Sequence, residues 1–130
     1  MIVIVSSSHY PDDERIYQKQ ICCLLEAGKK IVYYTKSSNK INLSNKNLIH
    51  INFDINFSIK VFIKKVFDDL LKRKFVFQIQ IHETELLPLL KIIKKIKNNI
   101  FTIYDVHEDM NALYRTFSNR IFIIKELAIL

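Results

Sequence analysis

Hydrophobic residues along this chain follow two different spacings, one typical of buried strands and the other of amphipathic helices. Five short runs are rich in β-branched and aromatic residues, as strands of a sheet covered on both faces usually are. They are "IVIV" at 2–5, "KIVYYT" at 30–35, "LIHINF" at 48–53, "FVFQIQI" at 75–81 and "NIFTIYDV" at 99–106. We therefore predict five strands.

Apolar residues at helical spacing separate most of these runs. The clearest helix is expected after Ser58, where apolar side chains recur at i, i+3, i+4 and i+7 as far as Leu71, with lysine and aspartate on the other side. Another is expected from Thr84, and Pro88 is tolerated there because it falls in the first turn. Helical spacing also runs from about Asn111 to the end of the chain.

The first helix is expected between the first two strands. Asp12 or Asp13 can cap its N-terminus, and Gly28 is placed to end it. Cys22 and Cys23 are adjacent and lack the spacing of a metal knuckle, so both are expected to be small buried side chains. The apolar side of this helix is predicted to carry Ile16, Cys23, Leu24 and Ala27.

Strand and helix alternate along the chain, except that a polar loop joins the second and third strands. This alternation predicts an α/β fold with a single Rossmann-like, doubly wound parallel sheet in the order 3-2-1-4-5. The chain has 130 residues, is 49% hydrophobic and contains one Gly and two Pro, so no flexible linker is evident. We expect one domain spanning residues 1–130.

Ligands of such a sheet bind beyond the carboxyl ends of the strands, where the strand order reverses, here between the first and fourth strands. Three strand ends are followed by histidines: His9 in "SSSHYPDDER", His82 in "HETE" and His107 in "HED". Since adjacent strands lie about 5 Å apart, these three histidines are expected within roughly 10 Å of one another. His50 lies inside the third strand and is expected to be an ordinary sheet residue.

Acidic residues near these histidines also have a purely structural interpretation. Acids in a first helical turn commonly cap the helix and complement its dipole. The residues concerned are Asp12, Asp13, Glu83 and Glu85. His107 is harder to explain in this way, because it stands with Glu108 and Asp109 at the end of a strand predicted to be buried. A functional role is the favoured interpretation of His107.

Several functional classes that share this fold are excluded by composition. A single glycine in the chain excludes the glycine-rich turn of dinucleotide-binding domains and the P-loop. A response-regulator receiver carries acids directly after its first strand, where this chain has serines at 6–8. A metal site built from the three histidines with Glu83 or Asp109 lacks a closely spaced ligand pair, so no metal is expected.

The net charge of +7 suggests an anionic partner, either nucleic acid or a membrane surface. Acids alternate with the lysines, and arginines do not cluster, which argues against nucleic acid. The lysine-rich helix faces at 58–73 and 84–97 favour an anionic membrane surface. No apolar run approaches the roughly 20 residues that span a bilayer, and "MIVIV" lacks the flanks of a signal peptide. We expect a cytoplasmic protein, with peripheral attachment to the inner face of the plasma membrane as a further expectation.

Three segments carry a family pattern. "HYPDDERIYQKQ" contains D-x-R-I-x-K, formed by Asp13, Arg15, Ile16 and Lys19, with Gln20 where the pattern has an acid. "HETELLPLL" has a histidine–acid pair, His82 and Glu83, before leucines and proline, and "DVHED" contains D-x-H-E, formed by Asp105, His107 and Glu108. In order and spacing these segments resemble the amino-terminal domain of family 4 glycosyltransferases of the GT-B architecture, especially bacterial enzymes that build surface polysaccharides. The resemblance runs from about Ile2 to Asp109.

This resemblance implies a retaining transferase without a bound cofactor or metal. It would move a sugar from a nucleotide-sugar donor to a sugar or lipid-linked glycan acceptor, in synthesis of capsule, lipopolysaccharide or another surface glycan. His107 would be the catalytic residue and would hydrogen-bond the donor sugar. The implied substrate-binding residues are His9, Asp13, Arg15, Lys19, His82, Glu83 and Glu108.

The chain departs from the family pattern in two respects. Family members carry a second α/β domain that holds the nucleotide, whereas this chain stops at Leu130. We therefore expect the amino-terminal half of a GT-B fold, inactive alone, with the donor-binding domain supplied by a longer product or a separate chain. The first loop also lacks the paired glycines that many members have near the donor. The rival interpretation is a non-catalytic α/β module that binds a partner protein or an anionic membrane.

Overall fold

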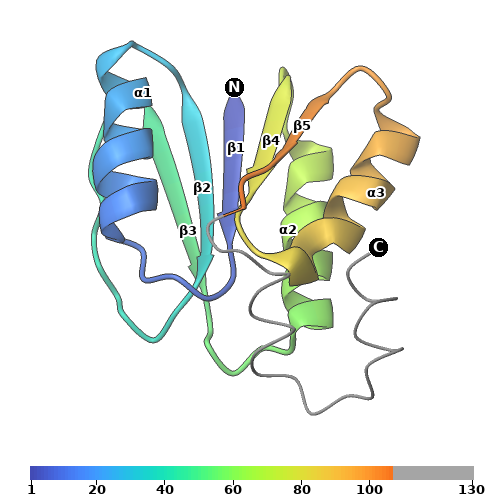
Figure 1. Cartoon of the computed structure of the whole chain (residues 1–130), viewed down its shortest axis with the longest axis horizontal. Helices are drawn as coiled ribbons and strands as arrows, with labels where there is room; N and C mark the ends of the chain where they lie inside the picture. Colours follow the sequence, from blue (N-terminus) through green and yellow to red (C-terminus); the bar gives the residue numbers. More distant parts are fainter. Residues whose placement is uncertain (107–130) are drawn as a thin grey trace.

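A single parallel sheet forms the centre of the protein, seen in a computed structural model that describes residues 1–106 (Figure 1). Its strands are β1 Ile2–Ser6, β2 Ile31–Lys36, β3 Leu48–Phe53, β4 Gln78–Ile81 and β5 Phe101–Tyr104. The strand order is β3-β2-β1-β4-β5, and all neighbouring pairs are parallel. The predicted α/β class and strand order are confirmed. The helix expected from about Asn111 lies outside the described residues.

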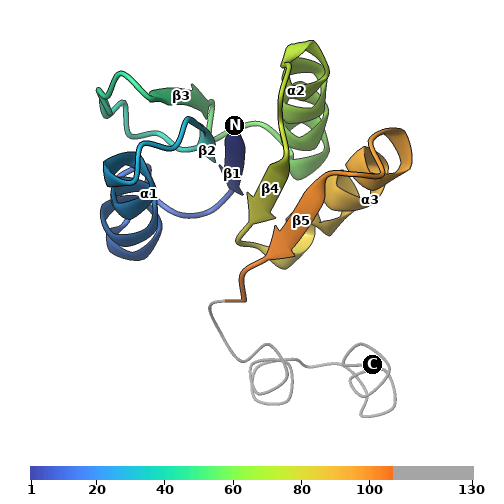
Figure 2. The same cartoon turned by 90° about the horizontal axis from the view of Figure 1, so that it is seen from above.

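Helices cover both faces of this sheet. They are η1 Glu14–Ile21, α1 Cys22–Glu26, α2 Ile59–Lys72, η2 Thr84–Leu86 and α3 Leu87–Ile96. Figure 2 shows α1 on one side of the sheet and α2 with α3 on the other. In the part of the chain that the structure describes, no helix has both the length and the apolar character needed to cross a bilayer.

Alternate residues of β1 contribute to two hydrophobic clusters, because successive side chains of a strand point to opposite faces. Val3 and Val5 belong to the larger cluster, which includes the buried side chains of α2 and α3. Ile2 and Ile4 belong to the smaller cluster, which includes Ile16 of η1. The central strand is therefore held from both sides, and the loop that follows it starts from a fixed position.

The amphipathic pattern after Ser58 forms α2 as predicted. Ser58 caps the helix, and its Oγ accepts a hydrogen bond from Val61 N at 3.3 Å. Phe62, Val66 and Leu70, each four residues apart, are buried against the sheet. The helix and its apolar face are thus specified by local sequence alone.

Tyr34, Asp69 and Arg73 connect β2 to α2 through polar contacts. The Tyr34 hydroxyl donates to Asp69 Oδ2 at 2.5 Å, and Arg73 Nε donates to the same Oδ2 at 2.7 Å. Burial alone would raise the pKa of Asp69, but the hydrogen bonds from Tyr34 and Arg73 outweigh it and hold the pKa below its usual value. Asp69 is therefore an ionised carboxylate at neutral pH, paired with Tyr34 and Arg73 through Oδ2.

The helix η1 is a π-helix, which the sequence pattern does not predict. Gln18 N donates to Asp13 O at 3.1 Å, and Cys22 N donates to Tyr17 O, both across five residues. A π-helix holds more residues in each turn than an α-helix, so side chains five apart come to the same side. The first helix is therefore wider at its start than its apolar spacing suggests.

The wide turn changes which side chains of the first helix face the sheet. Ile16 and Ile21, five residues apart, are buried. Cys23 and Ala27 are exposed, so their predicted place on the apolar side was wrong. Cys22 is half-buried, so the expectation of two buried cysteines was also wrong. α1 ends at Glu26, and Gly28 follows its C-cap residue Ala27 with a positive φ of 73°, the terminating place expected for it.

The fourth strand begins later than predicted. Its central neighbour β1 starts at Ile2, which pairs with Gln78, so residues 75–77 lie beyond the end of the ladder. Phe75 has a φ of 61°, which strand residues do not adopt, and it is 88% exposed. The Met1 ammonium group donates to Phe75 O at 3.0 Å. Phe75 and Phe77 are therefore surface residues, whereas Val76 between them packs against the larger hydrophobic cluster.

Replacing Tyr33 by phenylalanine is expected to leave the fold intact and to raise its stability. Tyr33 is fully buried, and among the described residues its hydroxyl has no hydrogen-bond partner. Burial, with smaller effects of Asp13 and Glu83, raises the pKa of this phenol, so it stays neutral. An unpaired buried hydroxyl costs about 1–3 kcal/mol, so Tyr33→Phe should gain on the order of 1 kcal/mol in urea unfolding. A loss of stability would show that the hydroxyl has a partner.

Candidate functional site

The loops after β1 and β4 meet at the carboxyl edge of the sheet. β1 and β4 are neighbours, so their carboxyl ends open onto the same edge. The buried Ser6 is the last residue of β1 and the buried Ser7 begins the loop after it, and the loop after β4 begins with His82 and Glu83. This is the point where the strand order reverses, as the sequence predicted for the site.

Glu83 is held by a group of donors from the last residue of β1 and from the loop that follows it. Its Oε1 accepts from Ser6 Oγ at 2.7 Å and from Ser8 Oγ at 3.1 Å. Its Oε2 accepts from Ser7 N at 3.0 Å. His9 Nδ1 lies 2.7 Å from Oε1, and an ionised carboxylate only accepts, so Nδ1 carries the proton. Glu83 thereby fixes both the loop and the orientation of the imidazole.

These donors keep Glu83 ionised in spite of its burial. Burial by itself would raise the pKa of Glu83, but the hydrogen bonds from Ser6, His9, Ser7 and Ser8 lower it further than burial raises it. The net pKa is below the usual value for glutamate. The edge therefore carries a fixed negative charge beside His9, whose side chain is 30% exposed.

The lowered pKa of Glu83 predicts a loss of stability in acid. A carboxylate with a depressed folded-state pKa stabilises the protein above its unfolded pKa of about 4.3, and this stability is lost as pH falls through the folded-state pKa. Urea unfolding between neutral pH and pH about 3 should show this fall, and Glu83→Gln should make it shallower. The fall that remains in Glu83→Gln is expected from Asp69. An identical pH profile in the variant would contradict the assignment.

A second polar group surrounds Asp105, which follows β5. Gln20 Nε2 donates to Asp105 Oδ2 at 2.7 Å, and Gln80 Nε2 lies 3.3 Å from the same atom. His82 Nδ1 lies 3.6 Å from Oδ2, and the His82 side chain is fully buried. Arg15 Nη2 lies 3.6 Å from Asp105 Oδ1 and is about half-exposed. This group joins β4, β5 and η1.

The remaining predicted site residues do not join these two groups within residues 1–106. Asp13 caps η1 by accepting hydrogen bonds from Arg15 N and Ile16 N at 2.9 Å each. This is the structural role that the sequence indicated as the alternative to substrate binding. Lys19 forms an exposed ion pair with Glu14. His107 and Glu108 lie outside the described residues. Their roles stay predictions.

No family model and no curated protein matches this sequence. Among solved structures, the chain is similar to OtsA in an apo structure, with a TM-score of 0.58 and 14% sequence identity. The match covers 89% of this chain and 36% of the OtsA chain. The similarity is one of fold. This chain spans about a third of the length of OtsA.

The residues that the sequence analysis missed are those that hold the site together. Ser6, Ser7 and Ser8 supply the donors to Glu83, and Gln80 approaches Asp105 from the neighbouring strand. Gln80 had a detectable signal, since an amide inside a run predicted to be buried needs a polar partner. The serines at 6–8 served only to exclude a response-regulator receiver, which has acids at this place.

Gln20 explains one departure from the family pattern. Its amide donates to Asp105 and its Oε1 accepts from Gln80 Nε2 at 3.0 Å. An acid at this position would place a second carboxylate against Asp105, which costs free energy unless one of them is protonated. The amide of Gln20 instead hydrogen-bonds to both Asp105 and Gln80, and Asp105 keeps a single negative charge near Arg15.

The site thus combines two fixed carboxylates with partly exposed cationic or titratable side chains. Glu83 orients His9, and Asp105 lies near Arg15. Within residues 1–106 no three His, Cys, Asp or Glu side chains are grouped so as to hold a metal ion. Such an edge can hydrogen-bond the hydroxyl groups of a polar substrate, with His9 Nε2 as an acceptor when the ring is neutral.

Proposed function

We propose that this chain is the acceptor-binding domain of a retaining, nucleotide-sugar-dependent glycosyltransferase that builds a bacterial surface glycan such as capsule or lipopolysaccharide. The observation that carries the proposal is the similarity in fold to OtsA over 89% of the chain, since OtsA is a glycosyltransferase of GT-B architecture. The three family segments noted in the sequence support it. Described residues of all three segments meet at the carboxyl edge, as the pairs His9–Glu83, Arg15–Asp105 and His82–Asp105 show.

In this proposal His9 and Arg15 contact the acceptor. Glu83 holds His9 by Nδ1, so the ring is oriented before the acceptor hydroxyl arrives. Arg15, near Asp105, donates to other hydroxyl groups of the acceptor. Lys19, His82 and Glu108 are assigned to the acceptor side through the family resemblance alone.

The donor is a nucleotide sugar held by a second α/β domain, in a longer product or in a separate chain. During transfer the acceptor oxygen bonds to the anomeric carbon while the bond from that carbon to the phosphate oxygen breaks. The proton of the acceptor hydroxyl passes to the departing phosphate, so charge and atoms balance. His107 would hydrogen-bond the donor sugar as its glycosidic bond weakens.

A transfer assay tests this function. The chain, joined to or mixed with the donor-binding domain of the complete enzyme, is incubated with radiolabelled UDP-, GDP- and ADP-sugars and with membranes from producing cells that lack the gene. Incorporation of label into lipid-extractable or polymeric glycan should depend on the added chain. If no donor gives labelling that depends on the chain, the proposal is wrong.

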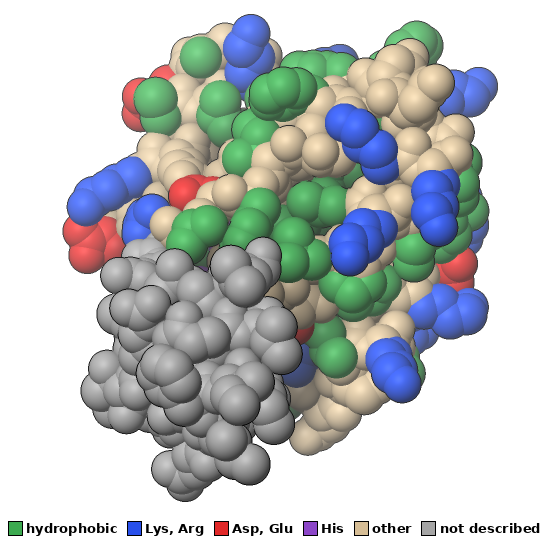
Figure 3. Space-filling view, turned by 45° about the vertical axis from the view of Figure 1, so that its right-hand side comes forward, with side chains coloured by type: hydrophobic (Ala, Val, Ile, Leu, Met, Phe, Trp, Pro, Cys, Tyr) green, Lys and Arg blue, Asp and Glu red, His purple; other side chains and the backbone are tan. Residues whose placement is uncertain are grey.

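A membrane-binding role is the second candidate, and it is favoured by one surface. Figure 3 shows lysine and arginine side chains spread among hydrophobic ones on the side of the molecule that carries α3 and β5. Phe75, Phe77 and Phe101 are 88%, 52% and 63% exposed. Exposed aromatic side chains beside lysines favour the interface of an anionic bilayer. This peripheral attachment is compatible with a lipid-linked acceptor.

Vesicle binding is the corresponding prediction. The chain should bind vesicles that contain phosphatidylglycerol, and binding should weaken between low and physiological salt because exposed charges are screened beyond about 8–10 Å. Phe75→Ser should weaken binding further by removing an inserted aromatic side chain. Tyr10→Ser is the matched control, since Tyr10 is also exposed, at 64%, but follows β1 at the opposite edge. Equal binding to neutral and anionic vesicles would rule out the electrostatic attraction.

A further inference from the structure

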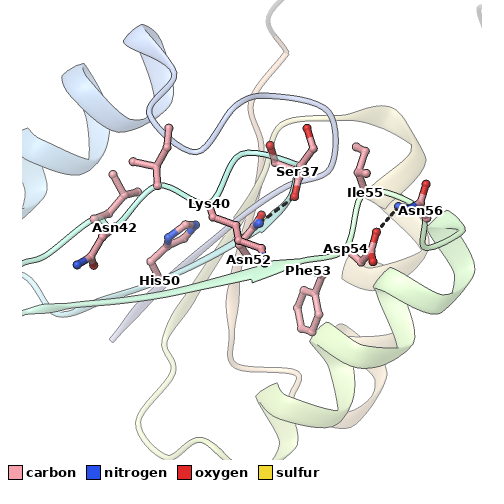
Figure 4. A pocket seen from close by; sticks show the side chains of 12 residues that line it. Ser37, Lys40, Asn42, His50, Asn52, Phe53, Asp54, Ile55 and Asn56 are labelled. Carbon is pink, nitrogen blue, oxygen red and sulfur yellow. Dashed lines mark hydrogen bonds between the residues drawn. The ribbon is translucent and has the colours of Figure 1, made fainter.

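An open groove of about 760 Å³ lies beside the edge strand β3, apart from the carboxylates described above. Figure 4 shows its two walls, with Ser37, Lys40 and Asn42 from the segment after β2 on one side and His50 and Asn52 of β3 on the other. Ile55 and Asn56, in the turn before α2, close one end. The sequence pattern predicted only a polar connection here.

Hydrogen bonds fix the side chains at the base of this groove. Thr35 Oγ1 donates to Asn52 Oδ1 at 2.7 Å, and Asn52 Nδ2 donates to Ser37 O at 2.9 Å. Because the single Thr35 hydroxyl proton is used in this way, His50 Nε2, 2.8 Å from Thr35 Oγ1, is the donor in that contact. Burial lowers the pKa of His50, which keeps the ring neutral and leaves Nδ1 as an acceptor.

The rims of the groove are also held in place. Ser37 N donates to Phe53 O at 3.1 Å, and Asn39 N donates to Ser37 Oγ at 3.0 Å. Lys36 Nζ donates to Ile55 O at 3.2 Å, which ties the turn before α2 to the end of β2. The groove is therefore a formed feature of the sheet edge rather than a gap between loose loops.

The chemistry of the lining favours a neutral, hydroxyl-rich ligand. Amides, hydroxyls and the His50 ring offer both donors and acceptors, and one formal positive charge, Lys40, is balanced by one negative charge, Asp54. Ile41, Leu43 and Ile55 add apolar contact. Phe53 packs its ring against Tyr34 and Phe62 on the other face of the sheet, so no Phe, Tyr or Trp ring among the lining residues is available to stack a nucleobase.

The groove lies at the carboxyl ends of the strands, as the Glu83 site does. Ser6 of β1, which donates to Glu83, is in register with Thr35 of β2, and Thr35 is in register with Asn52 of β3. Adjacent strands are about 4.8 Å apart, so the groove begins roughly 10 Å from the serines that hold Glu83. A chain of sugar units can extend over that distance, whereas a single sugar cannot.

We infer that this groove binds a neutral oligosaccharide, and that it holds the sugar units of the acceptor that lie behind the reacting one. The second half of this statement rests on the proposed function. The first half stands on the groove alone.

Titration of the isotopically labelled chain, followed by amide chemical shifts, tests the inference. The probes are neutral hexasaccharides of glucose and mannose at millimolar concentration, the corresponding monosaccharides, and a heparin hexasaccharide. At least one neutral hexasaccharide should shift the signals of residues 38–43 and 54–56. Its dissociation constant should be at least about tenfold lower than that of the corresponding monosaccharide. Binding should be insensitive to salt because the ligand is uncharged.

Two variants locate the binding within the groove. His50→Phe keeps a ring against Tyr33 but removes the hydrogen bonds of the imidazole, and Asn42→Ala removes an exposed amide from the rim. Each should weaken binding of the neutral hexasaccharide by about tenfold. Asn98→Ala, an exposed asparagine between α3 and β5, is the matched control and should bind like the parent.

The possible results separate this inference from the proposed function. If no neutral hexasaccharide shifts the groove signals, or if heparin binds there more tightly and in a salt-dependent manner, the inference is wrong. If the groove binds a neutral hexasaccharide but the transfer assay is negative, the inference of a glycan-binding groove stands and the proposed transferase function is wrong. Binding that Asn42→Ala and His50→Phe leave unchanged would place the ligand elsewhere.

Discussion

Glu83→Ala is expected to destabilise the protein by about 3–5 kcal/mol, more than any other single change at the carboxyl edge. The substitution removes the acceptor for Ser6, Ser7 and His9, and two of these, Ser6 and Ser7, are buried. Hydrogen bonds to a charged group contribute about 1.5–3 kcal/mol each, and buried donors left unpaired cost more than exposed ones. The melting temperature of a domain this size should fall by roughly 10–20 °C.

Two variants separate the carboxylate from general damage to the loop. Glu83→Gln keeps the shape and one acceptor, so its loss of stability should be smaller. Glu85→Ala removes an exposed carboxylate that accepts from Ser7 Oγ, and its effect should stay below about 1 kcal/mol. If Glu83→Ala and Glu85→Ala melt at the same temperature, Glu83 does not organise the loop.

His9→Ala should lower glycosyl transfer by about 100-fold while leaving most of the stability in place. In the proposed function the imidazole is oriented by Glu83 and contacts the acceptor hydroxyl, and removal of such a group costs about 100-fold or more. Glu83 keeps its serine donors in this variant, so the melting temperature should fall by a few degrees only. The measurement is the transfer assay described above, together with a thermal melt.

The pattern of other variants identifies the role of His9. His9→Gln, which retains a hydrogen-bonding side chain, should recover part of the activity. Asn98→Ala, at the opposite edge of the sheet, should match the parent in both measurements. Turnover of His9→Ala within threefold of the parent would remove His9 from the acceptor site.

Local patterns predicted most of the fold because those patterns coincide with burial. β3 occupies the predicted residues 48–53, and α2 buries Phe62, Val66 and Leu70 of the apolar repeat predicted after Ser58. The strand at 75–81 was predicted too long, because an apolar run alone does not show where the neighbouring strand ends. The π-helix was missed because its hydrogen bonds depend on tertiary packing around Ile16 and Ile21, which an α-helical spacing rule cannot detect.

The site was predictable in position but not in its contacts. Convergence of His9 and Glu83 follows from the strand order, since β1 and β4 are adjacent. The expectation that acids near helix starts are structural held for Asp13, which caps η1. Gln20 could not be predicted as a partner of Asp105, because the two are 85 residues apart and the contact depends on the wide turn of η1.

That wide turn makes the length of the first helix a coding constraint on the site. Arg15 and Gln20, five residues apart, both approach Asp105 because η1 fits an extra residue into each turn. Deletion of Gln18 or Lys19 would leave Ile16 and Tyr17 of the core in place and would put Arg15 and the glutamine four residues apart, the spacing at which side chains of an ordinary α-helix share a face. The number of residues and the kind of helix are therefore coupled in this segment. At its present length it brings Arg15 and Gln20 to Asp105 only as a wide turn, and one residue shorter it would do so only as an ordinary α-helix.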